Sequence, residues 1–188
     1  TTTADFKVNN SSYDYASWSF RKAKKFYDVV TYTGNGSNRT IAHNLGSVPG
    51  MIITKRLDGT SDWGVYHRSY GPGGPAGILN GTDAAFNLST YWNNTNPTSD
   101  VFSLGSFANV NTNGATYVAY LFAHETDAAS MIQCGGYTGN GSATGPVINL
   151  GWQPQWLMIK NTSSTYNWIM LDTMRGFSAA PSANTLFA

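Results

Sequence analysis

An internal repeat is the feature that most constrains this chain. The hexapeptide YTGNGS occurs at residues 32–37 and again at residues 137–142. When the sequence is shifted by 105 positions, residues 32–71 align with residues 137–176 without a gap, and 14 of the 40 aligned positions are identical. Because the composition alone would give only about three identities, the match indicates a duplicated unit rather than a turn that recurs by chance.

The segment before each hexapeptide also repeats, at an offset of 102 positions. Residues 15–20, YASWSF, correspond to residues 117–122, YVAYLF. The sequence therefore predicts the tail end of one unit in residues 1–31, a complete β-sandwich unit in residues 32–136, and the head of the next unit in residues 137–188. We expect the biological chain to continue in both directions.

The unit is predicted to be β structure throughout. Residues 117–122 and 15–20 alternate between two faces, and residues 50–56 and 155–161 are short apolar runs, as strands buried in a sheet are. No stretch has a helical period with caps. Short strands separated by Gly, Pro and Asn are typical of an all-β fold, and we expect an antiparallel β-sandwich of the jelly-roll or lectin-like type.

Two dipeptides are predicted to reverse the chain between strands. Asn113-Gly114 is the stronger signal, since both residue types accept the positive φ of a tight hairpin, and Asp58-Gly59 is the second. The hexapeptide YTGNGS itself is predicted to be a turn that leads into the next strand. No helix pattern and no Gly-Lys-Ser/Thr follows it, which argues against a phosphate-binding loop.

Composition excludes several classes of function. The formal net charge is +1 and only 11% of the residues are charged, against about 25% in a typical soluble domain. We therefore expect no nucleic-acid partner. No apolar run is long enough to span a bilayer, so we expect no membrane insertion. Cys134 is the single cysteine, so no internal disulfide can form.

The sequence contains no recognisable catalytic or metal-binding motif. Neither a nucleophile elbow nor a His-Glu-x-x-His zinc motif is present. His67 is replaced by Asp172 in the second copy, so the repeat preserves no histidine chemistry there. The stretch Asp58–Asp62 is rich in oxygen ligands but lacks the spacing of a calcium loop. We therefore expect no enzymatic activity, no catalytic residues, no metal and no cofactor.

Aromatic residues make up 14% of the chain, and one has unusual neighbours. Trp92 lies in the run YWNNTN, among several Asn side chains and close to Pro97. A flat ring flanked by amides suits a sugar, because the ring stacks on C–H groups while amides hydrogen-bond to hydroxyls. The alternative is that Trp92 covers the open end of the sandwich.

His67 and Arg68 form a second candidate contact for a ligand. The alternative for His67 is a strand histidine that bonds to a backbone carbonyl. The candidate glycan-binding residues are Trp92, Asn93, Asn94, Asn96, His67 and Arg68.

Taken together, several stretches resemble the tandem units in long structural proteins of tailed bacteriophages, in particular the tail-fibre proteins of marine phages. They are ASWSFRKAKKFYDVVTYTGNG, IAHNLGSVPGMIITKR, WGVYHRS, YVAYLFAHE and DTMRGFSAAPSANTLFA. The resemblance implies a virion or extracellular structural protein with lectin-like β-sandwich modules. It brings no established binding or catalytic residues with it.

Three functions follow from these patterns. The favoured hypothesis is an adhesive tail-fibre-like segment that recognises host-surface carbohydrate. The alternative is a structural filament, tube or decoration protein that binds only other copies of itself, since the edges of incomplete sheets invite pairing. A polysaccharide depolymerase is least favoured, because its two carboxylates have no distinguishing context among Asp58, Asp62, Asp83 and Asp100.

Overall fold

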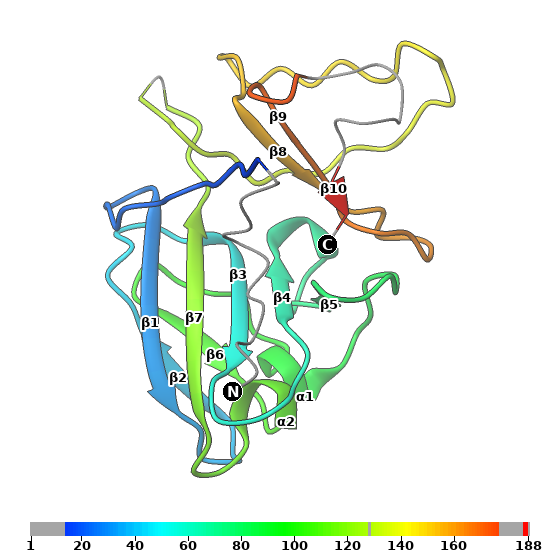
Figure 1. Ribbon diagram of the computed structural model, residues 1–188. Coiled ribbons are helices and arrows are strands. Elements are labelled where there is room, and N and C mark those ends of the chain that lie inside the picture. The colour runs from blue at the N-terminus through cyan, green and yellow to red at the C-terminus, as the bar shows by residue number, and fades with distance from the viewer. Residues whose placement is uncertain (1–13, 128, 177–185, 188) are drawn as a thin grey trace, which may run out of the picture.

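The computed structural model describes residues 14–127, 129–176 and 186–187, and antiparallel β-sheet dominates it (Figure 1). The largest sheet has five strands in the order β1-β7-β3-β4-β5. Every pairing in this sheet is antiparallel. Its strands are β1 (Tyr27–Thr33), β3 (Pro49–Arg56), β4 (Gly64–His67), β5 (Ala76–Ile78) and β7 (Thr116–Ala123).

A second layer packs against one face of this sheet, which we call the inner face. It consists of an antiparallel strand pair and two helical turns, and a further turn, η1, follows β4. None of the helices in the described part of the chain is long and apolar enough to cross a bilayer. The bounds are β2 (Arg39–Ala42), β6 (Val101–Leu104), α1 (Ser89–Trp92), α2 (Ala108–Asn111) and η1 (Arg68–Tyr70).

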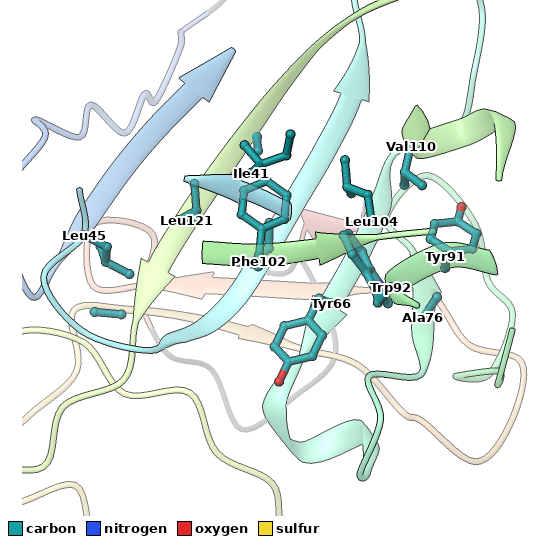
Figure 2. Close-up of a cluster of buried hydrophobic side chains, with 13 residues drawn as sticks. Ile41, Leu45, Tyr66, Ala76, Tyr91, Trp92, Phe102, Leu104, Val110 and Leu121 are labelled. Carbon is teal, nitrogen blue, oxygen red and sulfur yellow. The ribbon is translucent and has the colours of Figure 1, made fainter. Parts of the chain in front are cut away.

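Alternation along β7 divides the core into two clusters. Ala119 and Leu121 face the inner layer, whereas Tyr120 and Phe122 face the opposite side of the sheet, as the sequence pattern predicts. Figure 2 shows the inner cluster, in which side chains of β2, β6 and α1 lie against those of the large sheet. The central strands of the large sheet are therefore buried on both faces.

The outer face of the large sheet carries a cluster of its own, which we call the outer cluster. Tyr27, Met51, Val65 and Phe122 belong to it and come from four strands of the sheet. Trp168, which lies far away in the sequence, is buried in the same cluster. An apolar outer face of this kind needs a cover, and the C-terminal part of the chain supplies part of it through Trp168 and Met158.

That C-terminal part forms a three-stranded antiparallel sheet in the order β10-β9-β8. Figure 1 shows the β8–β9 hairpin in orange beyond one end of the large sheet. The bounds are β8 (Trp156–Ile159), β9 (Ile169–Asp172) and β10 (Leu186–Phe187).

The two hairpins pair in the same register. Met51 lies opposite His67 in β3–β4, and Trp156 lies opposite Asp172 in β8–β9. Each residue of the second pair comes 105 positions after its counterpart, and the same offset holds along the whole of both hairpins. Equivalent strands of the two sequence copies are thus paired in equivalent ways.

Side-chain contacts around the two hairpins agree as well. Lys55 Nζ donates a 2.5 Å hydrogen bond to the backbone oxygen of Ser61, and Lys160 Nζ donates one of the same length to the backbone oxygen of Tyr166. These residues are also 105 positions apart. In both hairpins, a lysine near the end of the first strand is hydrogen-bonded to the loop that leads to the second strand.

The predicted all-β class with antiparallel pairing is confirmed, and the turn at Asp58-Gly59 does connect two paired strands, β3 and β4. The turn at Asn113-Gly114 joins α2 to β7, so the expectation that it links two strands is wrong. A helical turn precedes it because the chain must cross from the inner layer back to the sheet.

The strand expected at residues 15–20 is absent. In the large sheet its equivalent, β7, lies between β1 and β3, and residues 15–20 have no such pair of neighbours. The first strand is Tyr27–Thr33 instead, so the predicted boundary between residues 31 and 32 falls within β1. Residues 1–13, 128, 177–185 and 188 of the predicted units lie outside the described residues.

Candidate functional site

Trp92 is a core residue, so the prediction that its ring stacks on a sugar is wrong. Its side chain is only 1% exposed and lies among the rings of Tyr66 and Tyr91, at centroid distances of 6.1 and 5.7 Å (Figure 2). A ring so enclosed has no face on which a sugar can stack. Trp92 instead belongs to the inner cluster, between the large sheet and the second layer.

The Asn residues after Trp92 have a conformational role. Asn93 and Asn94 have φ angles of 54° and 47°, and Asn93 in this left-handed conformation ends α1. Asn adopts this conformation more readily than other side-chain-bearing residues. The amide-rich sequence is therefore explained in part by the sharp turn that brings the chain out of the core.

The same turn places amide groups on the surface. Asn94 and Asn96 are exposed, and Asn93 Oδ1 accepts a 2.7 Å hydrogen bond from Nδ2 of Asn38 in the loop between β1 and β2. Thr95 Oγ1 donates to the backbone oxygen of Asn93 at 2.8 Å. We call Asn38, Asn93, Asn94 and Asn96 the amide cluster. The amide cluster offers uncharged hydrogen-bond donors and acceptors on a turn that these two hydrogen bonds hold in place.

His67 and Arg68 lie at the other end of the candidate set, where β4 passes into η1. The Nδ1 atom of His67 accepts a 3.1 Å hydrogen bond from the backbone N–H of Ser69, and the ring lies 5.4 Å from that of Tyr70. Burial lowers the pKa of His67 to about 4, and the charges of Arg68 and His124 contribute in the same direction. His67 is therefore a neutral, structurally engaged imidazole at pH 7.

Arg68 extends towards His124, which follows β7. A guanidinium N–H of Arg68 donates to His124 Nε2 at 2.9 Å, while the backbone N–H of Cys134 points at His124 Nδ1 from 3.1 Å. A neutral imidazole has a single acceptor nitrogen, so His124 can accept only one of these two hydrogen bonds. Burial and the neighbouring Arg68 accordingly lower the pKa of His124.

We call His67, Arg68 and His124 the Arg68 corner. At pH 7 it carries one positive charge, on Arg68. None of the ion pairs found among the described residues involves Arg68. With His67 and His124 both neutral, an exposed guanidinium remains that can bind a carboxylate or another anion. The sequence reasoning found His67 and Arg68 as neighbours but missed His124, because 56 residues separate it from Arg68.

Cys134 lies beside this corner but is not a reactive thiol. Its Sγ approaches the backbone oxygen of Ala123 at 3.4 Å, and burial raises the pKa of the thiol to about 12. Gly50 makes room for it, since a Cβ atom at that position would lie 2.6 Å from the Cβ of Cys134. The cysteine is a packing residue.

Three of the four aspartates considered for glycoside hydrolysis have separate hydrogen-bond partners. Asp58 accepts from Arg56 at 2.7 Å, Asp62 accepts from Asn80 at 3.0 Å, and Asp100 accepts from Ser99 at 2.8 Å. In residues 14–127 and 129–176, no group of three or more His, Cys, Asp or Glu side chains is arranged to hold a metal ion.

The amide cluster and the Arg68 corner are thus the two polar groupings that the fold builds from the predicted residues. The structure joins Asn93 to Asn38 through a hydrogen bond, with Asn94 and Asn96 exposed further along the same segment. It also brings Arg68, next to His67, into contact with His124. Trp92 belongs to neither.

Comparisons with known proteins give one match. Residues 1–186 match a family described as a domain of unknown function (DUF7483). No curated protein and no solved structure matches the chain. Since the family match spans nearly the whole sequence, the chain belongs to the DUF7483 family.

Proposed function

We propose that this chain is a structural segment of an extracellular or virion assembly, in which β-sandwich units of about 105 residues follow one another along the chain. The main support is the common register of the β3–β4 and β8–β9 hairpins at an offset of 105 residues. A turn that recurs by composition would reproduce a bend but not a register, because a slip of one residue exchanges the two faces of a strand. The resemblance to phage fibre units points in the same direction.

The layers of the first unit support a sandwich. The large sheet and the β2–β6 pair enclose one apolar cluster, with the helical turns α1 and α2 at its margin. Two packed layers around one core are the usual architecture of a stable β unit.

Contacts between the first unit and the C-terminal hairpin support stacking of units without a flexible linker. Trp168 is buried in the outer cluster, and hydrogen bonds connect β5 and the loop that follows it to the loop between β8 and β9. A junction that is both apolar and hydrogen-bonded resists bending, as a fibre requires. The bonds are Trp168 Nε1–H to Ile78 O at 2.8 Å, Tyr166 N–H to Thr82 O at 2.9 Å and Ala85 N–H to Thr162 O at 3.1 Å.

Trp168→Ala tests this junction. Removal of a buried tryptophan of this kind costs about 3 kcal/mol. We expect faster hydrogen exchange in β8 and β9 with little change in β3 and β7. Trp63→Ala is the comparison variant: Trp63 is the equivalent residue 105 positions earlier and lies half-buried on Tyr120 at the margin of the same outer cluster, so its loss should act mainly on the large sheet. Unchanged exchange in β8 and β9 after Trp168→Ala would show that the units are not held together by this contact.

A longer chain tests the array. We expect that each added 105-residue unit, cut so that β1 stays whole, increases the maximum dimension in small-angle scattering by a constant amount. Flexibly linked units would instead give an increase that becomes smaller with each copy, because the ends of a flexible chain separate roughly as the square root of its length. That result would contradict a stiff array.

Adhesion to host-surface carbohydrate is the second candidate function, and the amide cluster favours it. Asn94 and Asn96 are exposed on a loop whose shape is fixed by two left-handed residues and by the Asn38–Asn93 hydrogen bond. Fixed amides bind sugar hydroxyls without having to be ordered first. The exposed Arg68 would favour sugars that carry a carboxylate.

A glycan array tests this candidate. We expect the natural chain to bind, and the double variant with Asn94→Ala and Asn96→Ala to lose its signal. Arg68→Ala should lose only the signal from acidic sugars. Asn140→Ala, an exposed amide in the segment between β7 and β8, is the control. A natural chain without signal on any glycan would exclude adhesion and leave the structural role.

A further inference from the structure

The Arg68 corner contains more hydrogen-bond donors than acceptors. The guanidinium of Arg68 lies 2.9 Å from Nε2 of His124, and the backbone N–H of Cys134 lies 3.1 Å from Nδ1 of the same ring. Both neighbours can only donate, whereas a neutral imidazole accepts at one nitrogen and donates at the other. One of the two contacts therefore brings two N–H groups together without an acceptor.

Burial decides which of the two contacts this is. Cys134 is 7% exposed, and a buried backbone N–H without an acceptor is costly. Arg68 is exposed, so its guanidinium can turn towards solvent or a ligand. We therefore expect Nδ1 of His124 to accept from Cys134 and Nε2 of His124 to carry the proton. In this tautomer the Arg68 and His124 side chains present two donors to each other.

His67 adds a third donor to the corner. Its Nδ1 accepts the backbone N–H of Ser69 at 3.1 Å, so the proton of the neutral ring lies on Nε2. Burial lowers the pKa of His67, and the charges of Arg68 and His124 lower it further. The three side chains thus lie within range of one another's charges.

The acidic group nearest in sequence, Glu125, does not neutralise the corner. The ion pair found for Glu125 within the described residues is with Lys25, at 3.8 Å, and Arg68 has none there. Burial and then Arg68 lower the pKa of His124, and Glu125 raises it by less. The corner therefore keeps a positive potential, and its donors call for an acceptor that carries negative charge.

We propose that the Arg68 corner binds an oxyanion, a carboxylate or a sulfate group, with one oxygen accepting from both Arg68 and Nε2 of His124 and with His67 as the third donor. A guanidinium suits such a group, because its N–H donors form a planar fork that matches two oxygens. This inference deepens the contact with acidic sugars proposed above for Arg68, and it rests on that candidate function only for the source of the anion.

Nitrogen NMR of the imidazole rings tests the first step. At pH 7 we expect a protonated Nε2 and an unprotonated Nδ1 in both His67 and His124. His43 provides the reference signal, since its Nε2 lies 3.3 Å from the backbone oxygen of Thr98 and must carry the proton. A His124 ring with its proton on Nδ1 would overturn the proposal, because Arg68 would then already have its acceptor.

Titration of the natural chain with sulfate, acetate and glucuronate tests binding, with chloride keeping the ionic strength constant. We expect saturable shifts of the His124 Nε2 and Arg68 guanidinium signals for all three anions, and no shift with glucose. Tighter binding of glucuronate than of acetate would assign the anion to a sugar, and equal affinities would assign it to a free anion. Shifts that do not saturate would overturn the proposal.

Three variants separate the corner from a general effect of charge. Arg68→Gln should weaken binding at least about tenfold, because hydrogen bonds to a charged group are the strong ones. Arg68→Lys keeps the charge but loses the fork, so it should recover only part of the affinity. Arg21→Gln is the matched control, since it removes the same charge from another exposed arginine. Equal losses for Arg68→Gln and Arg21→Gln would overturn the proposal.

His124→Asn tests the second donor. The Asn side-chain oxygen can still accept from the backbone N–H of Cys134, but the Nε2 donor is lost, so we expect binding to weaken about threefold with the fold retained. An unchanged affinity would remove His124 from the site and overturn the shared oxygen. A chain that binds no oxyanion, but whose β8–β9 exchange still depends on Trp168, would refute this inference and leave the proposed structural role intact.

Discussion

The β3–β4 and β8–β9 hairpins have the same register but different surroundings. In β3 the first six residues are buried, whereas all four residues of β8 are half-buried. In the first hairpin, β7 pairs with the outer edge of β3, and the inner layer packs on one face. Among the described residues, the second hairpin has no strand at the edge of β8 and no inner layer. Local sequence is therefore enough to set the pairing of a hairpin, while its burial depends on strands that come from elsewhere in the chain.

Ile52 and Leu157, which occupy equivalent positions in the two hairpins, give the largest expected difference. Ile52 is fully buried in the inner cluster, and Leu157 is half-buried. We expect Ile52→Ala to lower the free energy of unfolding by about 3–4 kcal/mol, and Leu157→Ala to lower it by about 1 kcal/mol. Urea denaturation at low protein concentration measures both values. Equal losses would show that the second hairpin is as well packed as the first.

The hairpin register belongs to the part of the structure that can be predicted from the sequence. The repeat gave the strand equivalences, and alternation in residues 117–122 assigned Leu121 and Phe122 to opposite faces of β7, as found. Both depend on short-range patterns: the two-residue period of a strand and the similarity of two copies.

The candidate site was harder to predict, because it depends on contacts between distant residues. Trp92 has the neighbours of a surface loop, but one helical turn carries it into the core and the Asn residues then turn the chain outward. His124 and Cys134 join Arg68 only because β4 and the end of β7 are brought together by β3, which lies between them. No local motif marks a group of residues assembled in this way.

The equivalent positions 67 and 172 predict different responses to acid. His67 has a pKa of about 4 in the folded protein, below its usual 6.5, because it is buried. Between pH 6.5 and 4 the unfolded chain binds a proton at this residue and the folded chain does not, so stability falls in this window by about 3 kcal/mol. Hydrogen bonds from Arg175 lower the pKa of Asp172 below 3.8, so its contribution is lost only below that pH.

Unfolding measured from pH 7 to pH 3 tests this contrast. His67→Asn should flatten the slope between pH 6.5 and 4, and the slope that remains belongs to His43 and His124, whose pKa values burial also lowers. Asp172→Asn should leave the slope in that window unchanged, and its loss of stability relative to the natural protein should be present at pH 7 and become smaller only below about pH 4, where Asp172 itself takes up a proton. A slope in His67→Asn as steep as in the natural protein would mean that position 67 does not titrate as its burial predicts.

The two copies of the hexapeptide give the smallest expected difference. Gly36 and Gly141 have φ angles of 71° and 69°, in the left-handed region where an alanine costs about 1 kcal/mol. Gly36 connects β1 to β2, and its N–H donates to the backbone oxygen of Asn111 at 2.8 Å, so the turn cannot relax without disturbing the sheet. Gly141 lies in an exposed segment between β7 and β8, where a change of backbone angle disturbs no strand.

We therefore expect Gly36→Ala to lower the free energy of unfolding by about 1 kcal/mol and Gly141→Ala to lower it by a few tenths. Gly114→Ala separates backbone strain from crowding. Its φ is 77° and a Cβ there would meet no atom within 4 Å, yet its N–H is bonded to the backbone oxygen of Gly34. If Gly114→Ala matches Gly36→Ala, strain in an anchored turn explains both losses. If the loss for Gly114→Ala is as small as that for Gly141→Ala, the larger loss at Gly36 comes from crowding. The added Cβ at Gly36 would lie 3.4 Å from the Cβ of Asn113. Equal losses at Gly36 and Gly141 would instead show that the second hexapeptide is anchored as firmly as the first.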